Sequence, residues 1–218
     1  STLFPYTTLF RSTNRVCVPS GNFGNIYAGF LARSMGVPIR RLILATNENN
    51  VLEEFFTTGV YRPRSAADTL ATSSPSMDIS KASNLERFIW ALLGPEAFTQ
   101  HWAELETTGT LNLRDQLVRL GEEFGFVAGT SSHTDRLEAI RTVKERSGRL
   151  IDPHTADGVT VALRTMEPGF PTLVMETAKA AKFPQTVAEA LGTEPETTDV
   201  VADLLAQPQK VETIDNGW

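Results

Sequence analysis

Residues 15–25, RVCVPSGNFGN, decide the fold class. The apolar run Arg15–Pro19 predicts a buried strand, and the Ser-Gly pair after it predicts a turn. Helical periodicity over Ile26–Met35 stops at Gly36-Val37-Pro38, and the apolar run Arg41–Ala45 predicts a second strand. A strand, a helix of about ten residues and another strand form a βαβ unit. The sequence therefore predicts an α/β fold with a parallel sheet flanked by helices.

The rest of the chain extends this pattern. The apolar run Pro171–Met175 predicts a third strand, which we expect to lie in the same parallel sheet because parallel strands buried on both faces are continuously apolar. Residues 58–83 are polar and irregular, and we expect a helical insertion at about 85–150. Helical periodicity is found over residues 51–57, 85–93, 98–106, 111–124, 134–146, 155–166 and 183–191.

Composition excludes several classes of protein. The 218 residues are 41% hydrophobic and 21% charged with a net charge of −6, and they lack a large basic cluster, so we expect no nucleic-acid partner. No apolar run reaches the roughly 18 residues of a membrane span, so we expect a cytoplasmic protein with no membrane partner. The single cysteine, Cys17, lies in an apolar run and is expected to be a buried packing residue. The three histidines have no metal-ligand spacing, so no metal site is expected.

A candidate anion-binding loop, Ser20–Asn25, follows the first strand and opens the first helix. Unpaired N–H groups and the helix dipole stabilise an anion at such a position. Gly21 and Gly24 can adopt positive φ and permit a close approach, while Asn22 and Asn25 add donors. The spacing fits neither a Walker loop nor a GxGxxG motif, so phosphate binding and a plain strand-to-helix turn both remain open.

Several motifs occur in one order along the chain. They are VPSGNFGN (18–25), ATNENNVL (45–52), TGVY (58–61), SPSMDI (74–79), SNLER (83–87), DPHTA (152–156), ETA (176–178) and KF (182–183). In this order they resemble the threonine synthase family, in which the first motif is the cofactor-phosphate loop. One such motif alone would be weak evidence, but the ordered series covers about 170 residues.

The resemblance implies a fold-type-II pyridoxal-phosphate enzyme with a tryptophan synthase β-like fold, of which this chain would be part. It implies a lyase that converts O-phosphohomoserine and water into threonine and phosphate. The backbone N–H groups of Gly21, Asn22, Phe23, Gly24 and Asn25 would then hold the phosphate of pyridoxal 5′-phosphate. The Thr177 hydroxyl would hydrogen-bond the pyridine nitrogen; without the resemblance, a strand-end cap is the favoured interpretation of this residue.

Two departures from the family pattern concern lysines. Lys179 and Ala180 replace the His or Leu and the Pro that the family usually has between Thr-Ala and Ala-Lys-Phe. The family's Schiff-base lysine lies in a Phe-Lys-Asp context in the amino-terminal half, and no lysine of this sequence has that context. We therefore expect the catalytic lysine to lie upstream and this chain to be inactive by itself.

Substrate contacts are less sharply indicated. A substrate that carries a phosphate needs Arg, Ser, Thr or Asn donors, and Ser76, Asn84 and Arg87 lie in matching motifs. A turn, a helix cap and a surface cation are equally good interpretations of these three residues. His154 either lines the site or caps a helix, and Asp78 is interpreted as a turn or cap residue rather than a base.

Residues 2–12 are interpreted as the translation of DNA that is not part of the natural gene. Thr2–Ser12, TLFPYTTLFRS, resembles the translation of a common sequencing adapter. We expect residues 1–12 to be non-native and disordered, and residues 13–218 to be the carboxyl-terminal part of a pyridoxal-phosphate-binding catalytic domain. Two other functions remain open: another fold-type-II enzyme such as a serine or threonine dehydratase, and a non-catalytic phosphate-binding α/β module.

Overall fold

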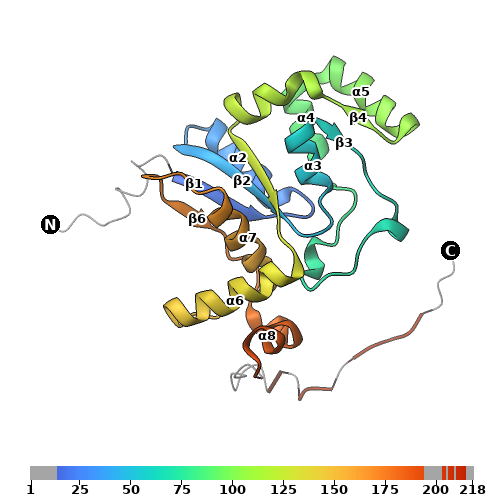
Figure 1. The fold of residues 1–218 in the computed structure, drawn as a ribbon. Coiled ribbons are helices and arrows are strands. Elements are labelled where there is room, and N and C mark those ends of the chain that lie inside the picture. The colour runs from blue at the N-terminus through green and yellow to red at the C-terminus, as the bar shows by residue number, and fades with distance from the viewer. Residues whose placement is uncertain (1–13, 194–202, 205, 209, 215–218) are drawn as a thin grey trace.

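The computed structural model describes residues 14–193, 203–204, 206–208 and 210–214. The expectation that residues 1–12 are disordered lies outside these residues. The predicted βαβ unit is present as β1 (Asn14–Pro19), α2 (Gly24–Ser34) and β2 (Ile39–Thr46). Both strands belong to a four-stranded sheet in the order β5-β2-β1-β6, in which all neighbours are parallel (Figure 1).

The third predicted strand lies in the same sheet. Strand β6 (Thr172–Val174) pairs with β1 in parallel, so the expectation of one largely parallel sheet is confirmed. The fourth strand, β5 (Phe126–Thr130), pairs with β2 at the opposite edge. It falls inside residues 85–150, so the expectation of a helical insertion there is wrong at this strand.

The same segment contains helices as well. Helices α4 (Leu85–Leu93), α5 (Pro95–Thr108) and α6 (His133–Ser147) are present. The continuous helix expected over residues 111–124 is replaced by the short strand β4 (Leu111–Asn112), a 3-10 turn and a π-helical turn. Strand β4 pairs with β3 (Val60–Tyr61) in a second, two-stranded sheet.

Helices cover both faces of the main sheet (Figure 1). On one face, Val18, Leu44 and Phe126 join a large core formed with α2, α3 (Val51–Thr58) and α4. On the other face, Cys17 and Ile43 pack against α7 (Pro153–Arg164). Side chains alternate between the faces of a strand, so two covered faces explain why the strands are continuously apolar.

The last elements pack around α7. Helix α6 contacts α7 and also α8 (Pro184–Leu191), and these helices share a small apolar cluster. The Ser132–Asp135 capping box begins α6, and Gly148 ends it in a left-handed conformation. Cys17 is buried, as predicted, and its thiol donates to the carbonyl oxygen of Gly158 at 3.2 Å.

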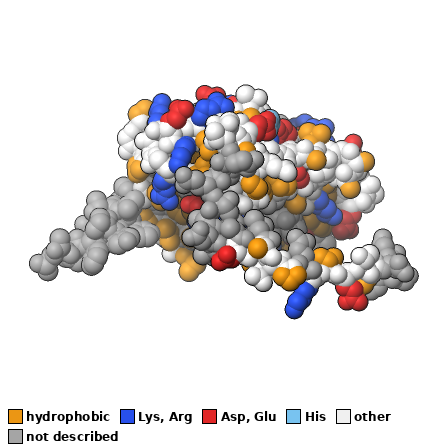
Figure 2. Space-filling view, turned by 90° about the horizontal axis from the view of Figure 1, so that it is seen from below, with side chains coloured by type: hydrophobic (Ala, Val, Ile, Leu, Met, Phe, Trp, Pro, Cys, Tyr) orange, Lys and Arg blue, Asp and Glu red, His pale blue; other side chains and the backbone are white. Residues whose placement is uncertain are grey.

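The surface is mixed in charge. On the face seen in Figure 2, acidic and basic side chains are interspersed among apolar ones, without a continuous basic area. Among the helices of the described residues, none is long and apolar enough to cross a membrane.

Candidate cofactor site

A cleft opens at the carboxyl ends of β1 and β6. The chain passes from β1 through α2 to β2 on one side, whereas β6 lies on the other side of β1, so the strand order reverses between β1 and β6. Parallel α/β sheets bind ligands at such a reversal. The cleft has a volume of about 300 Å³ and is lined by Pro19, Ser20, Gly21, Asn22, Phe23, Gly24, Asn25, Ser76, Met77, His154, Thr177 and Ala178. It therefore brings together the predicted phosphate loop, Thr177 and two of the four candidate substrate residues.

The phosphate loop presents backbone donors to this cleft. In the described part of the chain, no acceptor is found for the backbone N–H groups of Gly21–Asn25, and the first amide that bonds back into α2 is that of Tyr27, to the Phe23 carbonyl at 3.0 Å. These groups lie at the amino terminus of α2, where the helix dipole adds partial positive charge. The loop thus has free donors and a favourable potential for a phosphate dianion.

The left-handed residue of the loop is Phe23 (φ 67°), and neither Gly21 nor Gly24 has a positive φ. The expectation that the glycines supply this conformation is therefore wrong. A non-glycine residue in this region costs about 1 kcal/mol or more unless its surroundings hold it. The Phe23 ring is completely buried and stacks on Phe56 at 5.6 Å and on Phe126 at 6.0 Å between ring centroids. Core packing of the side chain thus sets the backbone of the phosphate loop.

Gly21 is needed for a close approach. A Cβ atom at this position would lie 3.0 Å from the Met77 Cα and 2.9 Å from the Ile79 side chain. The turn at Pro75–Met77, a 3-10 turn, therefore rests directly on the phosphate loop. Met77 is buried under this contact, while Ser76 is exposed toward the cleft.

Asn84 holds the other side of the loop. Its side-chain amide donates to the Asn22 carbonyl oxygen at 3.0 Å, and its backbone N–H donates to the same oxygen at 3.2 Å. The amide is therefore engaged with the loop, and Asn84 does not line the cleft itself. Asn84 is the N-cap residue of α4, but its side chain makes no capping hydrogen bond and contacts the loop instead.

His154 is buried at the base of the cleft. Its Nε2 accepts the backbone N–H of Ser76 at 3.0 Å, and its Nδ1 lies 2.8 Å from Asp152 Oδ1. Asp152 caps α7 by accepting the backbone N–H of His154, and it also accepts from the Thr155 hydroxyl. Burial alone would raise the pKa of Asp152, but the hydrogen bonds from His154 and Thr155 outweigh it and lower the pKa below its ordinary value. The carboxylate is thus stable in its ionised form at the floor of the site.

Thr177 follows β6 and lines the same cleft as the phosphate loop. Its backbone N–H donates to Thr155 Oγ1 at 3.4 Å, so this segment is tied to the start of α7. The nearby departure from the family pattern is peripheral, because Lys179 is exposed and pairs with Glu176 at 2.7 Å. Among the described residues, no lysine lines the cleft.

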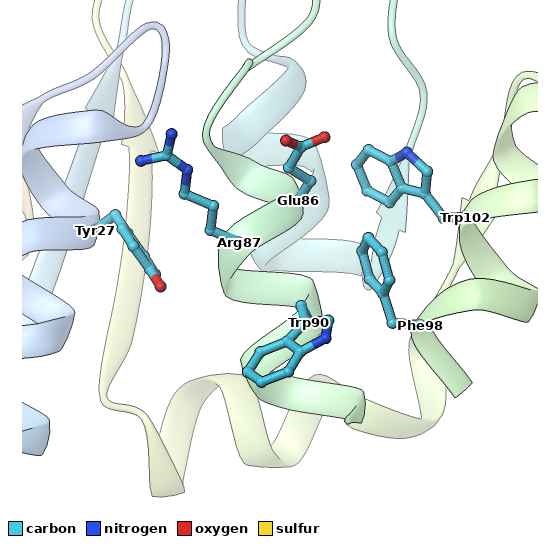
Figure 3. A pocket seen from close by; sticks show the side chains of 6 residues that line it. All are labelled: Tyr27, Glu86, Arg87, Trp90, Phe98 and Trp102. Carbon is cyan, nitrogen blue, oxygen red and sulfur yellow. The ribbon is translucent and has the colours of Figure 1, made fainter. Parts of the chain in front are cut away.

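Arg87 does not line the cleft. It lies in a separate, open pocket with Tyr27 of α2 and with aromatic residues of α4 and α5 (Figure 3). Figure 3 shows Arg87 extending from α4 on the side of Tyr27, whereas Phe98 and Trp102 lie on the other side of that helix. Helix α4 buries Leu85, Phe88, Ile89 and Leu92, so the helical period turns Arg87 outward. Arg87 therefore lies apart from the cleft that Ser76 and His154 line, and its contact with the substrate phosphate stays a prediction.

Asp78 is held entirely by structural contacts. Its carboxylate accepts from the side chains of Asn47, Asn49 and Thr72, at 2.8, 3.0 and 2.7 Å. These bonds join the loop after β2 to the SPSMDI segment. The interpretation of Asp78 as a turn residue rather than a base agrees with this geometry.

The proteins and solved structures to which this chain is similar include several threonine synthases. The chain is 50% identical over 202 residues to a threonine synthase from Methylobacillus glycogenes, which covers 91% of the chain and 42% of that protein. The chain is a homologue of threonine synthases. A family model described as "Threonine synthase, C-terminal" matches residues 155–218. The chain spans less than half the length of its threonine synthase relatives.

Solved threonine synthase structures match the fold. The pyridoxal-phosphate-bound enzyme from Brucella melitensis aligns with a TM-score of 0.83 at 35% identity, over 91% of this chain and 42% of that one. The yeast threonine synthase aligns with a TM-score of 0.84 at 30% identity, over 96% of this chain and 47% of that one. The predicted fold class, α/β of the fold-type-II kind, is confirmed over the aligned part.

Sequence reasoning did not assign roles to Asp152 and Thr155. A local signal was present, because Asp before Pro at a helix start is typical of an N-cap, and Thr155 lies three residues after it. That local pattern does not encode the links of these residues to other segments. Asp152 is linked to Ser76 through His154, and Thr155 accepts the backbone N–H of Thr177.

Proposed function

We propose that this chain carries the cofactor-phosphate and pyridine-nitrogen contacts of a threonine synthase, and that the complete enzyme acts on O-phospho-L-homoserine. One observation supports this above the others. The Gly21–Asn25 donors and Thr177 line the same cleft at the reversal of strand order, in a chain homologous to threonine synthases.

The residues of the cleft fit pyridoxal 5′-phosphate. The N–H groups of Gly21–Asn25 would hold its phosphate, and the Thr177 hydroxyl would hydrogen-bond the ring nitrogen. A volume of about 300 Å³ lies at the small end of ligand pockets, as expected for a compact cofactor. The bound cofactor supplies the electron sink for chemistry at the substrate's carbon atoms. A neutral hydroxyl opposite the ring nitrogen does not impose a proton there as a carboxylate would.

Ser76 remains the candidate for substrate contact. It lines the cleft beside the phosphate loop, and no hydrogen bond engages its hydroxyl among the described residues. His154 serves the site differently in this proposal, because both of its ring nitrogens are already engaged by Ser76 and Asp152. The Schiff-base lysine is proposed to come from outside these 218 residues, and a cytoplasmic location remains part of the proposal.

Cofactor titration tests the proposal. Pyridoxal 5′-phosphate is added to the 218-residue chain and followed by absorbance and intrinsic fluorescence, with ATP as the comparison ligand. We expect saturable, non-covalent binding of pyridoxal 5′-phosphate, competition by inorganic phosphate, and weaker binding by Thr177→Val. Preference for ATP would instead favour a nucleotide-binding module and refute the assignment.

Borohydride trapping tests the proposal that no lysine of this chain forms the Schiff base. After borohydride treatment in the presence of pyridoxal 5′-phosphate, mass spectrometry should find no stoichiometric label on any one lysine. Full labelling of Lys179 or Lys182 would contradict the view that the lysine lies elsewhere. Conversion of O-phospho-L-homoserine by a complete enzyme containing this region, without comparable activity on serine or threonine, would separate a synthase from a dehydratase.

A further inference from the structure

The carboxylate of Asp152 is linked by hydrogen bonds to two segments that line the cleft, the Ser76 turn and Thr177. It is completely buried at the N-cap of α7. Its Oδ1 faces His154 Nδ1 at 2.8 Å, and its Oδ2 accepts from the Thr155 hydroxyl. A helix cap needs only a backbone N–H, and here His154 supplies one at 2.9 Å. The two side-chain contacts are therefore additional to capping.

The first contact leads to the phosphate end of the cleft. Because the Ser76 N–H donates to His154 Nε2, that nitrogen must be unprotonated. The ring proton is then on Nδ1, where it is donated to Asp152. Asp152 thus selects the tautomer that can hold Ser76, and the turn of Ser76 and Met77 rests on Gly21 of the phosphate loop.

The second contact leads to the ring end of the cleft. The Thr155 hydroxyl has one hydrogen, which is donated to Asp152. Its oxygen lone pairs remain available, and one accepts the Thr177 N–H at 3.4 Å. Asp152 therefore also orients the acceptor that places the backbone of Thr177.

We infer that Asp152 is a positioning residue that sets the spacing between the two ends of the cofactor cleft, through His154 to the Ser76 turn and through Thr155 to Thr177. This inference rests on the proposed function, because it assumes that the cofactor's phosphate and ring nitrogen occupy those two ends. It assigns no direct contact between Asp152 and the ligand. The two routes from Asp152, one through His154 and one through Thr155, are called its arms, and each predicts a separate effect on ligand binding.

Ligand titrations separate the arms. Inorganic phosphate reports only the phosphate end, whereas pyridoxal 5′-phosphate reports both ends. We expect Thr155→Val to weaken pyridoxal 5′-phosphate by about fivefold, the equivalent of one hydrogen bond, and to leave the affinity for inorganic phosphate within about twofold of wild type. Thr155→Ser, which keeps the hydroxyl, should restore binding. Asp152→Asn, which can no longer accept from both partners, should weaken both ligands.

Asp135→Asn is the matched control, because Asp135 is a capping carboxylate of α6 that does not line the cleft. It should reduce the thermal midpoint without changing either affinity. Equal weakening of both ligands by Thr155→Val, or no weakening of either, would overturn the inference. If the wild-type chain binds neither ligand, the proposed function fails first.

A cofactor-independent measurement keeps the two failures distinct. Nitrogen-15 NMR of the histidine rings should show His154 protonated at Nδ1 in the wild-type chain and in Thr155→Val, and this signature should be lost in Asp152→Asn. A wild-type His154 protonated at Nε2 would overturn the inference whatever the chain binds.

Discussion

Replacing Arg136 by methionine should lower the stability of the fold, because it breaks a buried network of ion pairs. Arg136 lies in α6 with no solvent exposure. Its guanidinium contacts Glu48 at 2.8 and 2.9 Å, Asp157 at 3.1 Å and the Ser73 hydroxyl at 2.8 Å. Methionine has a similar helix propensity and a comparable length, so the change removes mainly the charge and its donors. The carboxylate of Asp157, itself fully buried, is left without its cation.

The pH dependence of the loss follows from the pKa of Asp157. Burial raises it from 3.8 to about 6, although the charge of Arg136 opposes the increase. A carboxyl group whose pKa is higher in the folded state makes folding less favourable as the pH rises from the unfolded to the folded pKa. In the wild type, with Arg136 present, a shift of this size already corresponds to about 3 kcal/mol of stability lost at neutral pH. Without Arg136 the pKa of Asp157 rises further, so the stability of the folded state continues to fall up to a higher pH.

We therefore expect Arg136→Met to lower the free energy of unfolding by about 3–5 kcal/mol near pH 7.5, as for other buried ion pairs that lose one partner. Near pH 5 the loss should be clearly smaller, because Asp157 can then be buried as a neutral acid. Urea unfolding followed by circular dichroism at both pH values measures the difference. The control is Arg146→Met on an exposed position of the same helix, which should change stability by no more than about 0.5 kcal/mol. A loss below about 1 kcal/mol, or the same loss at both pH values, would refute the reasoning.

Three further predictions concern single positions. Burial raises the pKa of Cys17 to about 12, so a thiol reagent near pH 8 should label it only on unfolding; rapid labelling of the native chain would contradict this. Ser132→Ala removes the cap of α6 and should cost about 1 kcal/mol in urea unfolding, and an unchanged midpoint would show that the capping box contributes nothing. Gly21→Ala should weaken the binding of pyridoxal 5′-phosphate several-fold, because the added Cβ would displace the backbone at Met77. Gly121→Ala, whose Cβ would meet no atom within 4 Å, should leave that binding unchanged. Equal effects of the two substitutions would argue against the close approach at Gly21.

Local sequence patterns determined much of the fold. Continuous apolar runs predicted β1, β2 and β6, because strands covered on both faces have no polar side to alternate with. Strand β5 was not predicted, because Ala128 and Gly129 interrupt its short run of strand-forming residues, and its pairing with β2 is a contact that the local pattern does not show. The sequence likewise predicted a candidate anion-binding loop between β1 and α2, and the order of its motifs indicated a resemblance to threonine synthases.

What the sequence by itself determined is therefore the α/β class and the position of the loop, and its resemblance to threonine synthases predicted which residues would contact a phosphate and a ring nitrogen. Tertiary structure alone decided which of those residues meet. The left-handed residue is Phe23 because its ring is held by Phe56 and Phe126 in the core, which no local rule for glycine anticipates. Asp152 reaches Ser76 and Thr177 through contacts between segments far apart in the chain. Such contacts depend on the packing of α7 against β1 and β6, and local propensity carries no information about them.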